Sequence, residues 1–235
     1  DLARQSFGGS LRLLEHFRSV PEIIAFSNAL CYDYEVLPLR EGYGVKVTPP
    51  TVSHYLPEAT SDRKVNEPEA LEVASLLVAA TMQPEYAHCT MGVVTLVGDD
   101  QAKLIDRLLV QHLPLTEYRR RRIVCGNAAQ FQGDERDVIF LSMVDAPEGD
   151  GPLAIRRSDV FIKRFNVAAS RARDQMWVVH SLDPVQHLKQ GDLREMIIRF
   201  ARDPSTLAPP PTEVERAATA SSRGDFEFHH KVGEW

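Results

Sequence analysis

The sequence has few cysteines and no long apolar run, and these absences exclude several classes of protein. Its three cysteines, Cys31, Cys89 and Cys125, form no CxxC pair and have no histidine at metal-ligand spacing. Neither a disulfide framework nor a zinc site is therefore predicted. No segment approaches the roughly 18 apolar residues that a membrane span needs, and the first residues do not form a signal peptide. We expect a reduced, cytoplasmic setting and no membrane partner.

An excess of positive charge is also absent. The formal net charge is -6, whereas domains that coat nucleic acid are usually strongly basic, so any contact with nucleic acid must be local. The apolar content of 43% over 235 residues suffices for one sizeable core, which predicts one main domain. The chain opens at Asp1 without a start methionine, which suggests a segment of a longer protein.

Strand and helix patterns alternate along most of the chain, and this alternation predicts an α/β fold with a parallel sheet flanked by helices. The expected strands are Leu11 to Glu15, Val93 to Val97, Ile123 to Cys125, Val138 to Val144 and Met176 to His180. Two helices are expected to start at N-terminal caps, one at Ser19 and one at a capping box formed by Asn66 and Glu69. Three more are expected over Ala102 to Leu109, about Asp159 to Ala172, and Leu193 to Phe200.

After Asp203 the periodicity ends, and Pro209, Pro210 and Pro211 introduce a stretch typical of a linker. The predicted organisation is one domain over residues 1–203, followed by a linker and tail over residues 204–235. The tail regains aromatic residues, so it is interpreted as a solvated tail or as the start of a further domain.

Three short segments combine residues suited to binding phosphate or nucleotide. In the first, Phe17 and Arg18 precede Pro21 at a helix start; an arginine donates a planar fork of hydrogen bonds to phosphate, and an aromatic ring offers a face to a base. The second, Phe131 to Asp137, places polar side chains directly before an apolar strand. The third, Arg164 to Arg173, has small residues followed by arginines.

Each segment taken alone also has a structural interpretation. Arg18 could be a surface arginine beside a core phenylalanine. Gly133 could allow a tight turn in a solvated loop. Arg171 and Arg173 could offset the negative end of a helix dipole. The co-occurrence of all three segments in order, on an α/β background, favours a functional interpretation.

Together the segments resemble the motifs of superfamily 1B helicases, in the branch typified by the nonsense-mediated decay helicase. The resemblance covers about residues 11 to 182 and implies the second RecA-like motor domain, with a P-loop NTPase fold, of a bacterial DNA helicase. The family's aromatic-Arg-x-x-Pro motif is matched by Phe17 to Pro21, and its Asn-x-x-Glu-Ala helix start by Asn66 to Ala70. Its motif V is matched by Phe131 to Asp137, and its motif VI by Asn166 to Arg173.

The resemblance implies a role for each matched residue. Arg18 and Arg171 would reach the γ-phosphate of ATP as catalytic arginines, Phe17 would stack on adenine, and Glu135 would hydrogen-bond the ribose. The remaining implied ATP-site positions are Gln132, Gly133 and Arg173. Thr95 and Asn127 remain candidate donors to a nucleic-acid backbone, although the family's Thr-Val-Asp before motif V is Asn127-Ala128-Ala129 here and its Pro-Tyr after Thr95 is Leu96-Val97.

The sequence holds no G-x-x-x-x-G-K-[ST] loop and no paired acidic motif on a strand for Mg²⁺. We therefore expect ATP and Mg²⁺ to bind against a missing N-terminal RecA-like domain, and this chain to be inactive alone. Single-stranded nucleic acid, in the first place DNA, is the expected partner. The alternatives are a non-catalytic RecA-like module that binds nucleic acid or protein, and an anchor for a nuclease domain.

Overall fold

The computed structural model describes residues 14–40, 44–131, 133–149 and 151–207, and its centre is a five-stranded, wholly parallel sheet. The strand order is β3-β7-β6-β4-β5. In chain order the strands are β3 (Thr51–Tyr55), β4 (Met91–Thr95), β5 (Val124–Asn127), β6 (Arg136–Ser142) and β7 (Ala172–His180). The expected α/β fold with a parallel sheet flanked by helices is confirmed.

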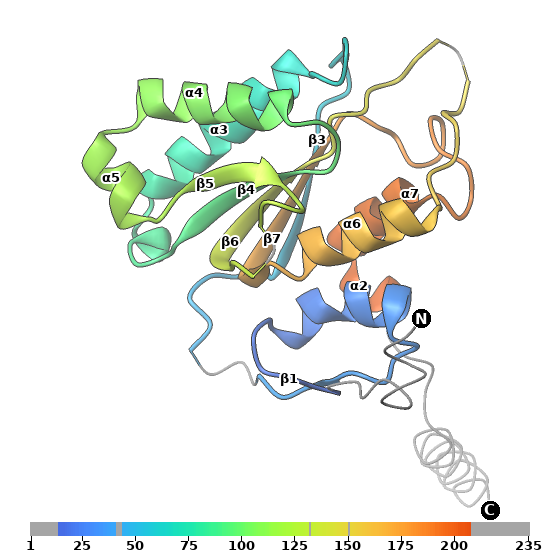
Figure 1. The fold of residues 1–235 in the computed structure, drawn as a ribbon, viewed down its shortest axis with the longest axis horizontal. Helices are drawn as coiled ribbons and strands as arrows, with labels where there is room; N and C mark the ends of the chain where they lie inside the picture. The colour runs from blue at the N-terminus through green and yellow to red at the C-terminus, as the bar shows by residue number, and fades with distance from the viewer. Residues whose placement is uncertain (1–13, 41–43, 132, 150, 208–235) are drawn as a thin grey trace, which may run out of the picture.

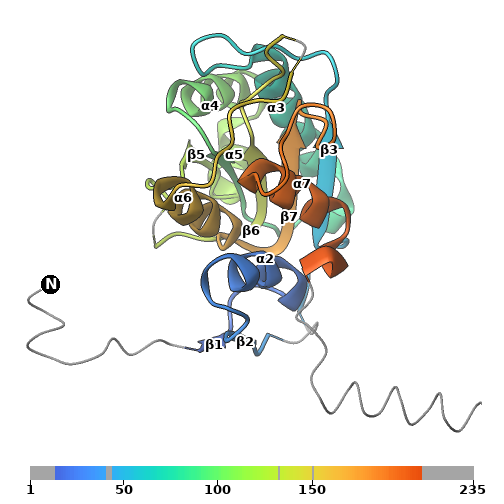
Figure 2. The same ribbon diagram turned by 90° about the vertical axis from the view of Figure 1, so that its right-hand side faces the viewer.

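Helices cover both faces of this sheet (Figures 1 and 2). The helices α3 (Glu67–Met82) and α4 (Asp100–His112) pack on one face, where Val93, Val138 and Phe140 form a core with them. The other face is covered by α2 (Pro21–Cys31), α6 (Asp159–Ala169) and α7 (Leu193–Arg202). Strands buried on both faces need apolar residues at consecutive positions, which explains the continuous apolar runs of β4 and β6.

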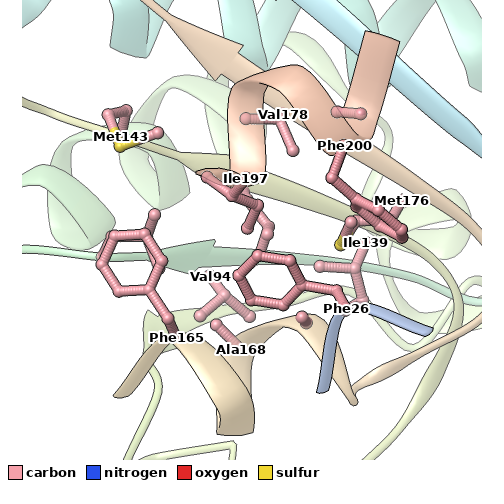
Figure 3. Packing of buried hydrophobic residues seen from close by; sticks show 14 of the residues in the cluster. Phe26, Val94, Ile139, Met143, Phe165, Ala168, Met176, Val178, Ile197 and Phe200 are labelled. Atoms are coloured by element: carbon pink, nitrogen blue, oxygen red, sulfur yellow. The ribbon is translucent and has the colours of Figure 1, made fainter. Parts of the chain in front are cut away.

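The second core is built mainly from aromatic and branched side chains (Figure 3). Phe26 of α2 and Phe200 of α7 lie with ring centroids 5.5 Å apart and an interplanar angle of 48°, a tilted arrangement that aromatic pairs favour. Phe165 of α6 and Ile139 of β6 are fully buried in the same cluster. This packing joins the beginning and the end of the domain and fixes α2 beside α6.

The remaining elements are short. A separate two-stranded sheet pairs β1 (Glu15–His16) with β2 (Leu37–Pro38) in parallel, and Figure 2 shows it beneath α2. The helix α5 (Leu115–Arg120) and the 3-10 helices η1 (Pro84–Tyr86) and η2 (Pro204–Leu207) complete the described elements. None of the helices in the described part of the chain has the length and apolar content needed to span a membrane.

Two expectations at the start of the domain are wrong. Ser19 is not the N-cap of α2: the cap is Val20, which makes no side-chain capping bond. The Ser19 hydroxyl instead donates to the Ala172 carbonyl at 2.7 Å, since tertiary contact with β7 competes with capping. The first strand is two residues long and pairs only with β2; residues 11–13 of its expected span lie outside the described residues.

The boundary between α6 and β7 also differs from the prediction. The helix ends at Ala169, and Ala172 already belongs to β7, paired with Arg136 of β6. Arg171 therefore lies in the turn between helix and strand, and Arg173 lies in the strand. The cap at Asn66 is confirmed, because its side chain accepts from the Glu69 amide at 3.0 Å. Most of the expected linker and tail lies outside the described residues.

Candidate functional site

Two segments far apart in the sequence meet where β6 and β7 begin, at the amino-terminal edge of the sheet. The Val20 amide donates to the Arg173 carbonyl at 2.9 Å, beside the Ser19 contact with Ala172. The Arg136 amide donates to the Arg171 carbonyl at 3.1 Å. The sheet thereby brings the residues around Arg18 next to both the Phe131–Asp137 loop and the Arg171–Arg173 segment.

Arg18, Arg171, Arg173 and Glu135 form a cluster at this edge, which we call the arginine cluster. Glu135 Oε2 lies 2.5 Å from Arg18 Nε, and Glu135 Oε1 lies 3.4 Å from Arg173 Nη1. The Nε groups of Arg18 and Arg173 are nevertheless buried without an aligned hydrogen-bond acceptor among the described residues. The carboxylate oxygens paired with them, Glu135 Oε2 for Arg18 and Asp137 Oδ1 at 3.9 Å for Arg173, are out of line for a hydrogen bond.

Arg171 is held by the backbone around it. Its Nε donates to the Val167 carbonyl at 3.0 Å, and its Nη1 donates to the carbonyls of Asp134 and Phe131 at 3.2 and 3.4 Å. Burial lowers the pKa of Arg171, and the positive charge of Arg18 lowers it further. Two guanidinium groups that repel each other across a partly buried space favour the arrival of a negatively charged ligand.

The Phe131–Asp137 loop divides into structural and ligand-facing residues. The buried Arg136 donates from Nε to the Arg122 carbonyl at 2.6 Å, and the buried Asp137 lies 2.8 Å from Lys46 Nζ. Glu135 pairs with Arg18 and Arg173 of the arginine cluster, and Asp137 Oδ1 also lies 3.9 Å from Arg173 Nε. Gly133 has a φ of +87°, a left-handed conformation that glycine adopts without strain, so the tight turn predicted for it is present.

Two further predicted nucleotide-site residues stand apart from these contacts. Phe17 precedes Arg18 and has 65% of its surface exposed, so its ring is available for a contact with a ligand. Gln132 lies outside the described residues. The structure thus brings together Arg18, Glu135, Arg171 and Arg173, with Phe17 and Gly133 adjacent in sequence.

Thr95 and Asn127 lie at the opposite, carboxyl-terminal edge of the sheet. Thr95 of β4 and Asn127 of β5 are paired with each other there. Thr95 is fully buried, and its hydroxyl donates to the Gly98 carbonyl at 2.9 Å. The Asn127 side-chain oxygen accepts from the Ala129 amide at 2.8 Å, and its amide donates to Asp99 at 2.5 Å. Neighbouring groups therefore already occupy the polar atoms of both side chains.

A pocket of about 620 Å³ opens beside these two residues. Its basic lining residues are Lys64, Lys163 and Arg164, and its acidic one is Asp99. Neither Lys64 nor Lys163 forms an ion pair within the part of the chain that the structure describes. In a chain of net charge -6, three basic residues around one pocket are a local concentration of positive charge.

Sequence reasoning did not find the two lysines. Lys64 follows Arg63 in a turn from Asp62 to Val65, and both central residues have positive φ values of 47° and 67°. Such a turn normally uses asparagine and glycine, so the pattern gave no signal for it. Lys163 lies on the exposed side of α6, where a lysine is unremarkable in sequence.

Comparison with known proteins agrees with an α/β domain of this type. A family profile described as an AAA domain matches residues 5–183, which is more than half of the chain. None of the curated proteins matches the chain. A solved structure with similarity to it is the C-terminal domain of a possible DNA helicase from Lactobacillus plantarum WCFS1, at 14% sequence identity and a TM-score of 0.44, covering 74% of this chain and 90% of that one. On the family match, the chain belongs to the AAA domain family.

Proposed function

We propose that this chain is the C-terminal, RecA-like motor domain of an ATP-dependent nucleic-acid helicase of superfamily 1B. The observation that supports this most directly is the arginine cluster, in which Arg18 and Arg173 pair with one carboxylate, their buried Nε donors lack aligned acceptors, and Arg171 lies within electrostatic reach of Arg18. Their charge fits the triphosphate of ATP, and the exposed Phe17 ring fits a base.

In this proposal Arg18 and Arg171 stabilise the negative charge that develops on the γ-phosphate during transfer. Arginines fixed in advance perform this task well, because they need little reorganisation during the reaction. The backbone contacts of Arg171 supply such fixation. Arg173 and Glu135 then orient the nucleotide, Glu135 through the ribose.

The acidic residues near the cluster do not fit a Mg²⁺ site. Glu135 is engaged by Arg18 and Arg173, and Asp137 by Lys46 Nζ and the Thr90 amide, both at 2.8 Å, and by Arg173 at 3.9 Å. A carboxylate neutralised by a cation is a poor magnesium ligand. We therefore propose that the P-loop and the Mg²⁺ ligands come from a separate RecA-like domain, with ATP between the two.

The same proposal assigns the carboxyl-edge pocket to a single strand, with DNA as the first candidate. Lys64, Lys163 and Arg164 supply the charge for its phosphates, and Asn127 and Thr95 shape the pocket wall. Nucleotide and strand would thus meet opposite edges of one sheet, so that closure on ATP can move the strand.

The deciding experiment measures ATP hydrolysis by the full-length protein with and without single-stranded DNA, for the wild type, Arg171→Lys and Arg171→Ala. We expect stimulated hydrolysis in the wild type and a loss of about 10³-fold in kcat for Arg171→Ala, by analogy with other arginines that act on phosphoryl transfer. Arg171→Lys should keep the charge but not the fork, and should remain impaired.

Arg119→Ala serves as a control, because Arg119 is an exposed arginine on α5. It should leave hydrolysis unchanged. A wild type without ATPase activity, or an Arg171→Ala variant that hydrolyses ATP normally while folded, would overturn the proposal.

A further inference from the structure

Arg40 lies outside every motif in the sequence, yet it contacts both arginine-bearing segments. Its Nη1 donates to the Arg18 carbonyl at 2.8 Å and to the Arg173 carbonyl at 2.8 Å. Its Nη2 forms an ion pair with Asp174, the residue after Arg173. One planar guanidinium group therefore joins the backbone of Arg18 to the backbone of Arg173.

This junction is buried. The Arg40 side chain is 12% exposed and the Asp174 side chain is 0% exposed. Asp174 also accepts from the Lys46 amide at 3.2 Å, which fixes the carboxylate from a second direction. The hydrogen bonds from Arg40 and Lys46 hold this carboxylate in one orientation, and through it the guanidinium plane of Arg40.

Stability alone explains such a pair poorly. Burying two charges costs desolvation energy, and well-packed apolar side chains often replace a buried ion pair without loss of stability. What an apolar pair could not supply is the pair of hydrogen bonds to the carbonyls of Arg18 and Arg173. Since the side chains of these residues meet at Glu135, the position of the two carbonyls decides how the arginine cluster converges.

We propose that Arg40 is a positioning residue for the nucleotide reaction. Together with Asp174 it sets the separation of the Arg18 and Arg173 segments, and hence the convergence of Arg18 and Arg171 on one phosphate. The inference rests on the proposed function, and it adds a residue that contacts neither the nucleotide nor the strand. Reacting groups misplaced by about 1 Å can lower a rate about 100-fold. A change at Arg40 can therefore lower the rate of hydrolysis without a contact between Arg40 and the nucleotide.

The test compares Arg40→Lys and Asp174→Asn with Arg121→Lys in the full-length protein. Arg121 is a matched control on the other side of the domain, because it too is a buried arginine that donates to two backbone carbonyls, those of Thr81 and Tyr86, and pairs with a carboxylate, Glu117. The measurements are kcat and KM for DNA-stimulated ATP hydrolysis, and Tm.

We expect Arg40→Lys and Asp174→Asn to lower kcat about 10- to 100-fold, with KM for ATP within about threefold of the wild type. Arg121→Lys should lower Tm by a similar amount to Arg40→Lys and leave kcat unchanged. This split between kcat and Tm would not arise from a merely structural role.

The possible failures are distinguishable. If the wild type hydrolyses ATP and Arg171→Ala does not, but Arg40→Lys matches Arg121→Lys in kcat, the positioning role is wrong and the proposed function stands. If the wild type shows no stimulated hydrolysis, the proposed function is overturned and the inference with it.

Discussion

At the scale of single residues, Glu135 has two contacts that bear on its role. It lies between Arg18 and Arg173, and more than a third of its side chain is exposed. Ion pairs this exposed contribute about 0–1 kcal/mol, so Glu135 is not retained for stability. Its free surface instead suits hydrogen bonding to a ribose hydroxyl, as the family resemblance implies.

This role predicts how the protein discriminates between nucleotides. Wild-type protein should show a higher KM for 2′-deoxy-ATP or 3′-deoxy-ATP than for ATP, by about 10- to 100-fold for the hydroxyl that Glu135 binds, because hydrogen bonds to charged groups contribute about 1.5–3 kcal/mol. In Glu135→Ala the ratio should fall towards one. Steady-state kinetics with the three nucleotides provides the measurement.

The comparison also has a clear negative outcome. If Glu135→Ala discriminates against the deoxynucleotides as strongly as the wild type, Glu135 serves only to hold Arg18. Asp134→Ala is the control, since the Asp134 side chain pairs with Arg136 at 2.5 Å and the backbone carbonyl that contacts Arg171 is kept in the variant.

The sequence named residues at both edges of the sheet, and their roles at a nucleotide or a strand stay predictions. The motif residues Arg18, Glu135 and Arg171 were named from the sequence, and the structure places them together. For Thr95 and Asn127 the sequence predicted donors to a strand, a role that stays untested. What it could not indicate is that Gly98 and Asp99 occupy their polar atoms, because that depends on how the loop after β4 folds back.

At the scale of elements, the start of α3 holds a buried carboxyl group with a strongly raised pKa. Glu69 is fully buried; its Oε1 accepts from Ser142 Oγ at 2.6 Å and from the Val144 amide at 2.8 Å. Burial raises the pKa of Glu69 to about 8. The helix start is therefore tied to the end of β6 through a carboxyl group that is protonated at neutral pH.

A raised pKa fixes the sign of a pH dependence. The folded protein keeps this proton up to about pH 8, whereas the unfolded chain loses it near 4.5. The contribution of Glu69 to the free energy of unfolding is thus fully present below pH 4.5 and is lost as the pH rises towards 8. Glu69→Gln removes the titrating group and should gain stability relative to the wild type by about 1 kcal/mol per pH unit across that window.

Urea unfolding of wild type and Glu69→Gln at pH 5.5, 6.5 and 7.5 measures this difference. His180, whose pKa burial lowers to about 4, affects both proteins equally and cancels. Glu67→Gln is the matched control, because Glu67 is exposed on the same helical turn. A stability difference for Glu69→Gln that stays constant with pH would show that Glu69 is ionised in the fold.

Interior strands with continuous apolar runs were predictable; of the two edge strands, β5 was predicted at Ile123 to Cys125 and β3 was not. The apolar runs of β4 and β6 marked both strands to within a few residues. The edge strand β3 buries only Thr51 fully and has polar residues beyond it, so its sequence gave no strand signal. The start of β7 was predicted as helix because Ala168, Ala169 and Ala172 favour helix, and only pairing with β6 overrides this tendency.

At the scale of the whole molecule, the sheet separates two charged sites. The arginine cluster lies where β6 and β7 begin, and the basic pocket lies where β4 and β5 end. Parallel strands make this separation obligatory, since every strand presents its amino end to one edge and its carboxyl end to the other. A change at one edge can therefore reach the other only through the sheet and the helices packed on it.

The overall acidity of the chain makes the proposed strand contact testable as a salt effect. In a chain of net charge -6, the proposal assigns binding of single-stranded DNA to the few cations of the pocket. Each phosphate neutralised on a single strand contributes about -0.7 to the slope of log K against log salt. A Lys64→Ala, Lys163→Ala double variant should weaken binding and make the slope shallower by about 1.4.

Fluorescence anisotropy with a labelled oligonucleotide across a range of salt concentrations gives both quantities. Arg107 and Arg119 are exposed on α4 and α5 away from the pocket lining, so an Arg107→Ala, Arg119→Ala variant changes the net charge equally. If the pocket holds the strand, only the lysine variant flattens the slope. If both variants flatten it alike, the strand senses the overall field of the molecule and the pocket is not its site.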